Sequence, residues 1–287
     1  MPPSQNYVFI SGATSGIGAS TACFALDAGF HVIAGCYPDL AAGRELKERD
    51  PDRVTLVALD VTSSESINDA VAKIAHLTGG RGLRGLVNSA GIALLSPAEL
   101  ITVEEFRQVL SINLIGLFAL TRELLPLLRQ GGGTVVNISS DAGLLAMPTG
   151  AAYCSSKFGV EALSDVFRAE TIGQGVQFAV VEPGNIDTPI WEMLHRPVRK
   201  KYEALTPEQH RLYGDYLESL LATERQGIPV ERVARVILSA LQSRRPRTRY
   251  RVGPDAHLSW LVAKLPARMR DALANRIVKS YATCQSS

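Results

Sequence analysis

The stretch YVFISGATSGIG, residues 7–18, joins a short apolar run to a turn that contains three glycines. The run YVFIS has the composition of a buried strand, and the sequence after the turn has helical length. Gly12, Gly16 and Gly18 therefore open a helix directly after a strand. Such a turn lets the backbone approach a pyrophosphate, while the helix N-terminus supplies amide donors and a partial positive charge. The spacing G-x-x-x-G-x-G is not the commonest dinucleotide fingerprint, so the turn alone is weak evidence for a nucleotide.

The rest of the chain continues this alternation of strand and helix. Apolar runs rich in Val and Ile predict strands at 7–11, 31–35, 54–60, 85–91, 133–140 and 176–184. A seventh strand, RTRYRVG at 247–253, is expected to close the sheet. Segments of helical length lie at about 17–29, 40–49, 64–78, 103–129 and 152–172. Continuously apolar strands separated by helices indicate a parallel sheet that is covered on both faces. We therefore predict an α/β fold, a Rossmann-type doubly wound parallel sheet of about seven strands, as a single domain over residues 1–287.

The composition limits the classes of function. The chain has 287 residues, of which 46% are hydrophobic and 20% charged, and its formal net charge is +2. This near balance gives no support to nucleic-acid binding, which favours a strong basic excess. The four cysteines show no C-x-x-C spacing and the five histidines no H-x-x-x-H pairing, so we expect reduced thiols and no metal site.

The beginning of the chain, MPPSQNYVFISG, runs directly into the first predicted strand. It lacks the succession of basic region, apolar run and cleavage site that is typical of a signal peptide. No window of about 18 uninterrupted apolar residues predicts a membrane span. We therefore expect a cytoplasmic protein.

Two further strand ends carry groups that suit a dinucleotide. Asp60, followed by Val61, ends the third predicted strand, where its carboxylate could accept a hydrogen bond from an adenine amino group. NSAG, residues 88–91, ends the fourth with small side chains that leave room for a cofactor. The alternatives are a helix cap for Asp60 and a tight turn for NSAG. These positions follow successive strands, and ligands of open α/β sheets bind at the carboxyl ends of the strands.

The stretch AAYCSSKFGVEA, residues 151–162, places Tyr153 and Lys157 four positions apart on one helix face. A free phenol has a pKa of about 10, which is too high for a base near neutrality. We expect the neighbouring ammonium to lower the pKa of Tyr153 by roughly 1 to 3 units and so to make it a proton-transfer group. The alternative is an amphipathic helix with one interfacial Tyr and one solvated Lys.

These motifs occur in the order and spacing of the short-chain dehydrogenase/reductase family, which the chain resembles over roughly residues 6–190. The matching pieces are SGATSGIG, NSAG, Asn113 in SINLIG, Ser140 in VVNISSDAG, Tyr153 with Lys157, and EPGNIDT at 182–188. The resemblance implies an NAD(P)-dependent oxidoreductase that transfers a hydride between the nicotinamide and a secondary alcohol or ketone.

The resemblance also implies roles for individual residues. The catalytic set is Asn113, Ser140, Tyr153 and Lys157. Ser140 would donate to the substrate oxygen, with Ser139 as the competing candidate, and Asn113 would hold a water through its main chain. Lys157 would also bond the nicotinamide ribose. The implied cofactor-binding residues are Gly12, Ser15, Gly16, Ile17, Gly18, Tyr37, Asp39, Asp60, Val61, Asn88, Ala90, Gly91, Tyr153, Lys157, Pro183, Gly184, Ile186 and Thr188.

The choice between NAD and NADP depends on the end of the second strand, HVIAGCYPDL. A carboxylate there selects NAD, and a nearby Arg accommodates the phosphate of NADP. Gly35 and Cys36 occupy the position where the deciding side chain is often found, and Ser15 replaces a basic residue in the glycine turn. The missing Arg or Lys favours NAD, with Asp39 as a ribose partner, while Arg44 is the argument for NADP.

A finer resemblance, carried by HVIAGCYPD, LDVTSSES, AYCSSKFGVEALSD and VVEPGNIDTP, is to the branch that contains retinol and hydroxysteroid dehydrogenases and a 3-hydroxybutyrate dehydrogenase. It implies a small lipophilic substrate such as a hydroxysteroid, a ketosteroid or a retinoid. The apolar residues that would surround the reacting carbon are Leu145, Met147, Trp191, Met193 and Leu194. The alternative is that these side chains belong to the core.

Two segments lie outside this pattern. Residues 190–226 are polar, include the basic run RPVRKKY and resemble the family poorly, and we predict an insertion that covers the substrate. Residues 256–283 mix apolar and basic side chains, and we expect a C-terminal helical extension that packs on its own domain, with contact to a membrane surface as the alternative. By analogy with the family, the helices near 103–129 and 152–172 predict a homodimer or homotetramer.

Two other functions stay open. A reductase of carrier-bound 3-ketoacyl chains would share the catalytic set and need a basic docking patch, for which the chain offers Arg196, Arg199, Lys200 and Lys201. A noncatalytic dinucleotide-binding scaffold would be indicated by a broken Tyr153 and Lys157 pair, which is intact here.

Overall fold

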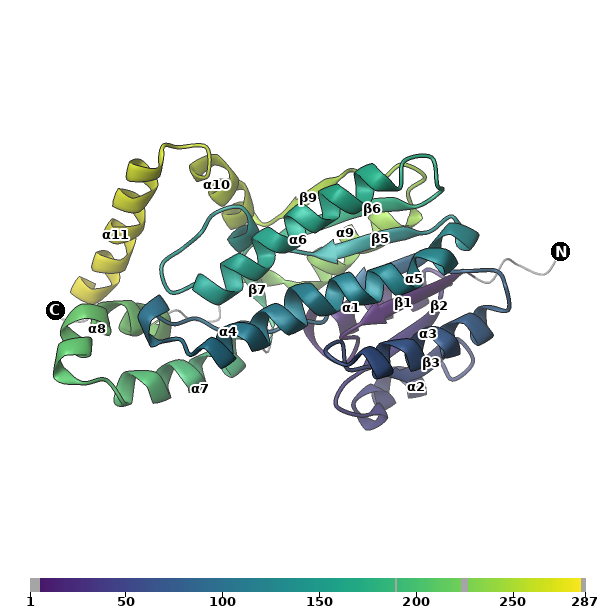
Figure 1. The fold of residues 1–287 in the computed structure, drawn as a ribbon, viewed down its shortest axis with the longest axis horizontal. Helices are drawn as coiled ribbons and strands as arrows, with labels where there is room; N and C mark the ends of the chain where they lie inside the picture. The colour runs from purple at the N-terminus through teal and green to yellow at the C-terminus, as the bar shows by residue number, and fades with distance from the viewer. Residues whose placement is uncertain (1–5, 189, 223–226, 285–287) are drawn as a thin grey trace.

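The computed structural model describes residues 6–188, 190–222 and 227–284. Its centre is a seven-stranded parallel sheet in the order β3-β2-β1-β4-β5-β6-β9 (Figure 1). The strands are β1 (Tyr7–Ser11), β2 (His31–Cys36), β3 (Val54–Ala58), β4 (Gly85–Asn88), β5 (Thr134–Ile138), β6 (Gln177–Pro183) and β9 (Arg249–Val252). A separate two-stranded sheet pairs β7 (Ile186–Asp187) with β8 (Ile228–Pro229). The predicted doubly wound α/β fold is confirmed.

Helices cover both faces of the main sheet (Figure 1). They are α1 (Gly16–Asp27), α2 (Arg44–Arg49), α3 (Ser64–Thr78), α4 (Val103–Leu110), α5 (Leu117–Gly131), α6 (Ala151–Glu170), α7 (Ile190–Glu203), α8 (Pro207–Ala222), α9 (Val230–Gln242), α10 (Pro254–Val262) and α11 (Ala267–Cys284). Helices α1 and α9 contribute to the core on one face, and α3, α5 and α6 contribute to the core on the other.

The first strand shows why the sequence reads as a continuous apolar run. Side chains alternate between the two faces of a strand. Val8 and Ile10 belong to the core under α1 and α9, whereas Phe9 belongs to the core under α3 and α5. All three are fully buried. A strand with two buried faces needs apolar residues at every position, as the sequence predicted.

Several predicted elements end earlier or are divided. The strand predicted at 85–91 ends at Asn88, and residues 89–91 continue as a loop. The helix predicted at 40–49 is a 3-10 turn, Leu40–Gly43, followed by α2. Asp39 caps the beginning of the 3-10 turn, because its Oδ1 accepts a hydrogen bond from the amide of Ala41 at 2.8 Å.

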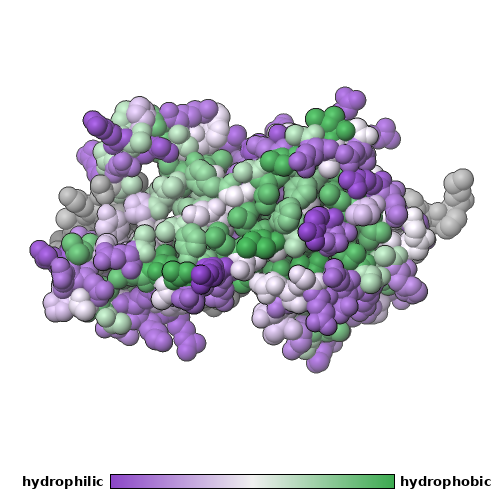
Figure 2. Space-filling model, viewed as in Figure 1, coloured by the Kyte–Doolittle hydropathy of each residue, from purple (hydrophilic) through white to green (hydrophobic). Residues whose placement is uncertain are grey.

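The helix predicted at 103–129 contains a π-helical turn, Ser111–Gly116, between α4 and α5. The whole stretch Val103–Gly131 is long and apolar enough to cross a membrane by length and composition alone. Its inner side buries Leu120 and Leu124 in the core of the sheet. Its outer side exposes Ile115 and Phe118, and Figure 2 shows apolar side chains gathered over this face of the molecule.

The predicted insertion forms α7 and α8, which pack on each other around a small core of Leu194, Val198 and Leu217. The C-terminal segment forms α10 and α11. Helix α10 packs beside β9, and α11 packs against α8 (Figure 1). The insertion and the chain's last helix are therefore side by side, beyond the carboxyl ends of the strands, where they form one wall of the cavity described next.

Candidate active site

A cavity of about 620 Å³ lies at the carboxyl ends of the central strands. It begins at the turn after β1 and reaches the helices of the insertion. From the sequence-based predictions it brings together Gly12, Ser15, Gly16, Ile17, Ala90, Gly91, Ser140, Met147, Tyr153, Lys157, Pro183, Gly184, Ile186, Thr188 and Leu194. One space is thus shared by the predicted cofactor residues, most of the catalytic set and part of the substrate set.

Other predicted residues do not line this cavity. They are Gly18, Tyr37, Asp39, Asp60, Val61, Asn88, Asn113 and Leu145. Leu145 is buried, as the alternative of a core residue expects, and its predicted place in the substrate pocket stays a prediction. The side chains of Trp191 and Met193 lie outside the described residues.

The glycine turn leaves room and donors for an anion. Gly12 has φ +65°, and a Cβ there would lie 2.9 Å from the backbone of Ala90. A Cβ on Gly18 would lie 2.1 Å from the carbonyl oxygen of Gly12, so Gly18 lets α1 pack against its own turn. Ser15, at the helix N-cap, makes no side-chain capping bond, and Gly16 lines the cavity. First-turn amides without a side-chain cap fit the pyrophosphate of a dinucleotide.

The side chains of Asp60 and Asn88 make hydrogen bonds to other parts of the protein. The Oδ1 of Asp60 accepts hydrogen bonds from the amide of Thr62 at 2.8 Å and from its hydroxyl at 2.6 Å. Asn88 Nδ2 donates to Thr121 Oγ1 at 2.9 Å and to Asn137 Oδ1 at 2.8 Å. The Asn88 bonds join β4 to α5 and β5. The Asn88 side chain is thus used within the protein. The cofactor-binding roles predicted for Asn88 and for Asp60 stay predictions.

The end of β2 is compact and carries no basic side chain. Cys36 is fully buried, and Tyr37 is 62% exposed. Asp39 is exposed, but its carboxylate caps the following 3-10 turn. Arg44, the first residue of α2, is exposed on the surface nearby. The ribose contacts predicted for Tyr37 and Asp39 stay predictions.

Asn113 holds the loop after β4 in place. Its Oδ1 accepts from the amide of Ile92 at 2.8 Å, and its Nδ2 donates to the carbonyl of Ile92 at 2.8 Å and to Ser156 Oγ at 3.1 Å. The side chain is thus fully used in tying this loop to α6. Asn113 sits in the π-helical turn, a distortion that is frequent at functional sites because it alters the main-chain bonding pattern. Its predicted main-chain role stays a prediction.

Tyr153 and Lys157 lie on consecutive turns of α6, and both line the cavity. The Lys157 Nζ is 5.6 Å from the centroid of the Tyr153 ring. It donates a hydrogen bond to the carbonyl of Ile138, the last residue of β5, at 2.8 Å. The i,i+4 spacing therefore brings the two groups to one site.

The pKa values of this pair correct one expectation. Burial raises the pKa of Tyr153 to about 12, against a smaller lowering from its hydrogen bond with Ser140. Burial also lowers the pKa of Lys157 to about 8, although Glu161 acts in the opposite direction. The expected net lowering of the Tyr153 pKa is therefore wrong for the protein's own groups, because desolvation of the phenol is the largest influence and outweighs the groups that favour the phenolate.

Ser139 and Ser140 have different surroundings. Ser139 is buried and packs close to Gly143, where an added Cβ would lie 2.6 Å from its hydroxyl oxygen. Ser140 Oγ donates to Asp141 Oδ1 at 2.8 Å and accepts from the amide of Ala142 at 3.2 Å. Of the two serines, it is Ser140 whose hydrogen bond lowers the pKa of Tyr153. The geometry therefore favours Ser140 over its neighbour as the hydroxyl beside the reacting atoms.

Sequence reasoning missed several cavity residues. They are Asp141, Asn185, Tyr216, Ser219, Leu220, Asp255 and Ala274. Asp141 could have been noticed as an acid directly after Ser140. The residues of α8 lie in the insertion that was predicted to cover the substrate, although its polar sequence did not single them out. The contributions of α10 and α11 had no local signal, because they depend on how the C-terminal segment folds back over the sheet.

Comparisons with known proteins agree with this geometry. The family model described as short chain dehydrogenase matches residues 6–198. Short-chain dehydrogenase/reductase family 9C member 7 of Bos taurus is 38% identical over 95% of this chain and 90% of its own length. Retinol dehydrogenase 5 of Mus musculus is 37% identical over 97% of this chain and 90% of its own length.

Solved structures share the fold. A short-chain dehydrogenase from Streptomyces avermitilis aligns with a TM-score of 0.77 and 26% identity, covering 100% of this chain and 99% of that one. Serine dehydrogenase complexed with NADP+ aligns with a TM-score of 0.72 and 25% identity, covering 86% and 94%. The chain therefore belongs to the short-chain dehydrogenase/reductase family, as a short-chain alcohol dehydrogenase/reductase that resembles the retinol dehydrogenase branch.

Proposed function

We propose that the protein transfers a hydride between a nicotinamide dinucleotide and a secondary alcohol or ketone on a bulky lipophilic molecule, with hydroxysteroids, ketosteroids and retinoids as the first candidates. The observation that carries this proposal is the shared cavity. Tyr153, Ser140 and Lys157 line the same 620 Å³ space as the glycine turn of α1 and the helices of the insertion. A cavity of this size suits a cofactor end together with a ring-sized substrate.

The bound nicotinamide supplies or accepts the hydride. Tyr153 carries the proton of the substrate oxygen. Its pKa of about 12 keeps the phenol protonated at neutral pH, which suits it to act as the acid in ketone reduction. For alcohol oxidation the phenol must first lose this proton, and the ammonium of Lys157, charged below its pKa of about 8, favours that loss. Ser140 would stabilise the substrate oxygen as its charge develops.

The far wall of the cavity supports a lipophilic substrate. It presents Ala93, Leu95, Met147, Leu194 and Leu220, with Tyr216 and Ser219 as polar groups among them. An apolar wall with few polar groups is typical of pockets that bind hydrophobic small molecules. The name of the relative retinol dehydrogenase 5 points to the same class of alcohol.

We favour NAD as the cofactor, with NADP as the alternative. The end of β2 offers a buried Cys36 and an acidic Asp39, and the glycine turn carries Ser15. None of these would pair with a 2′-phosphate, and Arg44 on α2 is the side chain that could. The test is the ratio of kcat/KM values with the two cofactors. A ratio above one for NAD over NADP supports this choice, and a strong preference for NADP contradicts it.

The proposed reaction is tested by following the reduced nicotinamide with a panel of compounds. The panel contains ketosteroids, retinoids, short polar oxo acids and 3-ketoacyl thioesters, each with both cofactors. Turnover of the steroid or retinoid group supports the proposal, and turnover limited to polar acids contradicts it. Turnover of thioesters alone supports the carrier-bound reductase, for which Arg196, Arg199 and Lys200 are exposed on α7. Lys201 is bound to Glu105 and the carbonyl of Leu100.

We also propose that the protein is a homodimer or homotetramer through the outer side of α4, α5 and α6. Apolar side chains are exposed there, among them Ile115, Phe118, Phe158 and Val166. Light scattering coupled to size-exclusion chromatography tests this, and Phe158→Lys should shift the mass toward the monomer. A monomeric wild-type protein contradicts it.

A further inference from the structure

We propose that Asp141 is a positioning residue whose protonation state sets the direction of the Ser140 hydroxyl proton. The inference rests on the function proposed above and adds a residue that the family resemblance did not supply. Asp141 follows Ser140 directly, in the 3-10 turn after β5, and lines the cavity beside Tyr153.

The hydrogen-bonding capacity of Ser140 is the first step. A serine hydroxyl has one hydrogen to donate and two lone pairs to accept with. In the structure the oxygen lies 2.8 Å from Asp141 Oδ1 and accepts from the amide of Ala142 at 3.2 Å. An ionised Asp141 is an acceptor only, so it takes the single hydroxyl hydrogen. Ser140 then has nothing left to donate to a substrate oxygen.

A protonated Asp141 reverses this bond. The carboxylic acid donates its own hydrogen to Ser140 Oγ, while the amide of Ala142 donates to the second lone pair. With both lone pairs occupied, the Ser140 hydrogen is no longer held by Asp141 and can be donated to another acceptor in the cavity, which Ser140 lines together with Tyr153. The distance between Ser140 Oγ and Asp141 Oδ1 is thus compatible with both arrangements. Whether the Ser140 hydroxyl can donate to a substrate depends on whether Asp141 carries a proton.

The surroundings of Asp141 favour the protonated form. Burial is the largest influence and raises the pKa of Asp141, and the negative charge of Asp255 on α10 raises it further. Hydrogen bonds from Ser140, from Ala142 and from Ser259 at 3.4 Å act in the opposite direction. On the α6 side, Tyr153 and Cys154 face Asp141, and both have raised pKa values, so both are neutral near pH 7.

The sign of the pH dependence follows. Below the pKa of Asp141 the acid is protonated and Ser140 donates to the substrate. As the pH rises through that pKa, above the ordinary range of an aspartate, Asp141 ionises and captures the Ser140 hydrogen. At pH values above the pKa of Asp141, the wild-type kcat should therefore fall by about tenfold per pH unit until the ionised form limits the rate. This part of the pH profile of kcat is its falling limb.

Asp141→Asn tests this directly, because the amide keeps the shape and donates to Ser140 at every pH. The expected result is that the falling limb disappears. Asp255→Asn is the matched control in the same cavity. It leaves Asp141 in place but removes a charge that raises its pKa, so the limb should remain and move to lower pH. A residue that only supports the fold would scale kcat at all pH values without changing the shape of the profile.

A second readout needs no turnover. Infrared difference spectra of wild type minus Asp141→Asn, taken across the pH range without substrate, isolate the carbonyl band of a protonated Asp141 from other buried acids. The band should be present at low pH and disappear over the same range as the kinetic limb. An ionised Asp141 over the whole range, or a limb that survives in Asp141→Asn, overturns the inference. If the wild type turns over no compound, the proposed function fails, and the infrared titration still decides where the proton is.

Discussion

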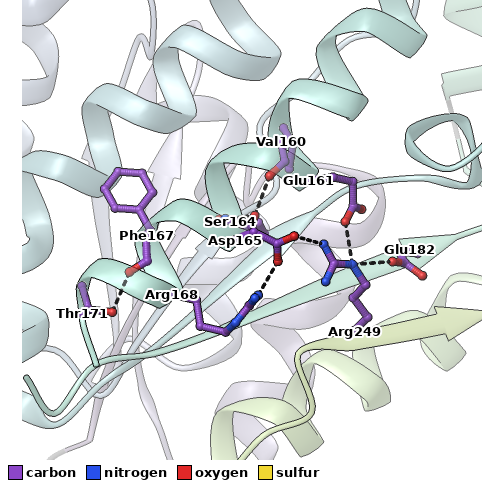
Figure 3. Close-up of polar contacts among 10 residues, drawn as sticks. Val160, Glu161, Ser164, Asp165, Phe167, Arg168, Thr171, Glu182 and Arg249 are labelled. Atoms are coloured by element: carbon purple, nitrogen blue, oxygen red, sulfur yellow. Dashed lines mark hydrogen bonds and ion pairs between the residues drawn. The ribbon is translucent and has the colours of Figure 1, made fainter. Parts of the chain in front are cut away.

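Helix α6 carries two sets of ionisable side chains on its successive turns. Tyr153 and Lys157 face the cavity. Farther along, Glu161 and Asp165 face β6 and β9, where Arg249 lies between them and Glu182 (Figure 3). The Arg249 guanidinium is 2.9 Å from Glu161, 2.9 Å from Asp165 and 3.3 Å from Glu182. One helix thus contains a set with opposite charges in contact and a set without them.

The pKa values show what this difference does. Hydrogen bonds and charge from Arg249 and Arg168 lower the pKa of Asp165 despite its partial burial, and Asp165 and Glu161 raise the pKa of Arg249. Asp165 and Arg249 are thus held in their charged forms. Lys157 bonds to a carbonyl instead of a carboxylate, and burial lowers its pKa to about 8. Paired charges fix α6 to the sheet, whereas a desolvated charge is brought near neutrality, where it can take part in proton transfer.

Glu182 lies between these two cases. It is fully buried, and it contacts Arg249 at 3.3 Å and Arg251 at 3.1 Å. Burial and the negative charge of Glu161 nevertheless raise its pKa to about 7. Two cations are therefore not enough to offset the desolvation of a fully buried carboxylate.

Lys157→Met should give the largest effect on the cavity set. Removing the ammonium should lower kcat by about 10²- to 10³-fold, because Tyr153 loses the charge that favours its phenolate. The free energy of unfolding should not fall, since a desolvated charge is replaced by an apolar group of similar length. Steady-state kinetics and urea unfolding measure the two quantities. A large loss of stability with unchanged kcat would remove the distinction between the two sets.

Arg249→Met should have the opposite profile. It leaves Glu161 and Glu182 without their shared cation, and we expect a loss on the order of 3 kcal/mol in unfolding free energy. Arg168→Met is the matched control, because Arg168 contacts only the partly exposed Asp165 among these acids and should cost less than about 1 kcal/mol. Denaturant unfolding at neutral pH compares them. Equal losses in both variants would show that the cluster does not act as a unit.

Glu182→Gln should change the pH dependence of stability by a smaller amount. The folded pKa of about 7 lies above the ordinary 4.5, so the folded state holds the proton more tightly. Wild-type stability should therefore fall as the pH rises from about 4.5 to 7, by at most about 3 kcal/mol, and stay level above that range. In Glu182→Gln this contribution to the fall in unfolding free energy with pH should be absent. An unchanged slope would mean that Glu182 has the same pKa in the folded and unfolded states.

The fold could be predicted because its signals are local. The central strands of the sheet are buried by helices on both faces, so each reads as an apolar run, and the glycine turn after β1 marks the start of α1. The Tyr153 and Lys157 pair was equally local, since helical spacing alone brings the groups together. The strand ends were set too long because residues 89–91 remain small and apolar after the strand has become a loop.

What the sequence could not give depends on distant contacts. The bonds of Asn88 to Thr121 and Asn137 join elements that are 33 and 49 residues away. Asp255 reaches the cavity only because α10 packs on the turn that contains Asp141. The direction of the Tyr153 pKa shift was wrong for the same reason, because the amount of protein around the phenol is not visible in a short stretch of sequence.

The central claim is that Tyr153 exchanges the proton in a cavity that binds the cofactor independently of that hydroxyl. The direct measurement is Tyr153→Phe, with cofactor affinity determined by fluorescence titration and turnover by following the reduced nicotinamide. We predict a dissociation constant within about twofold of wild type and a kcat lower by about 10²- to 10⁴-fold. A variant that keeps turnover within tenfold of wild type would contradict the account.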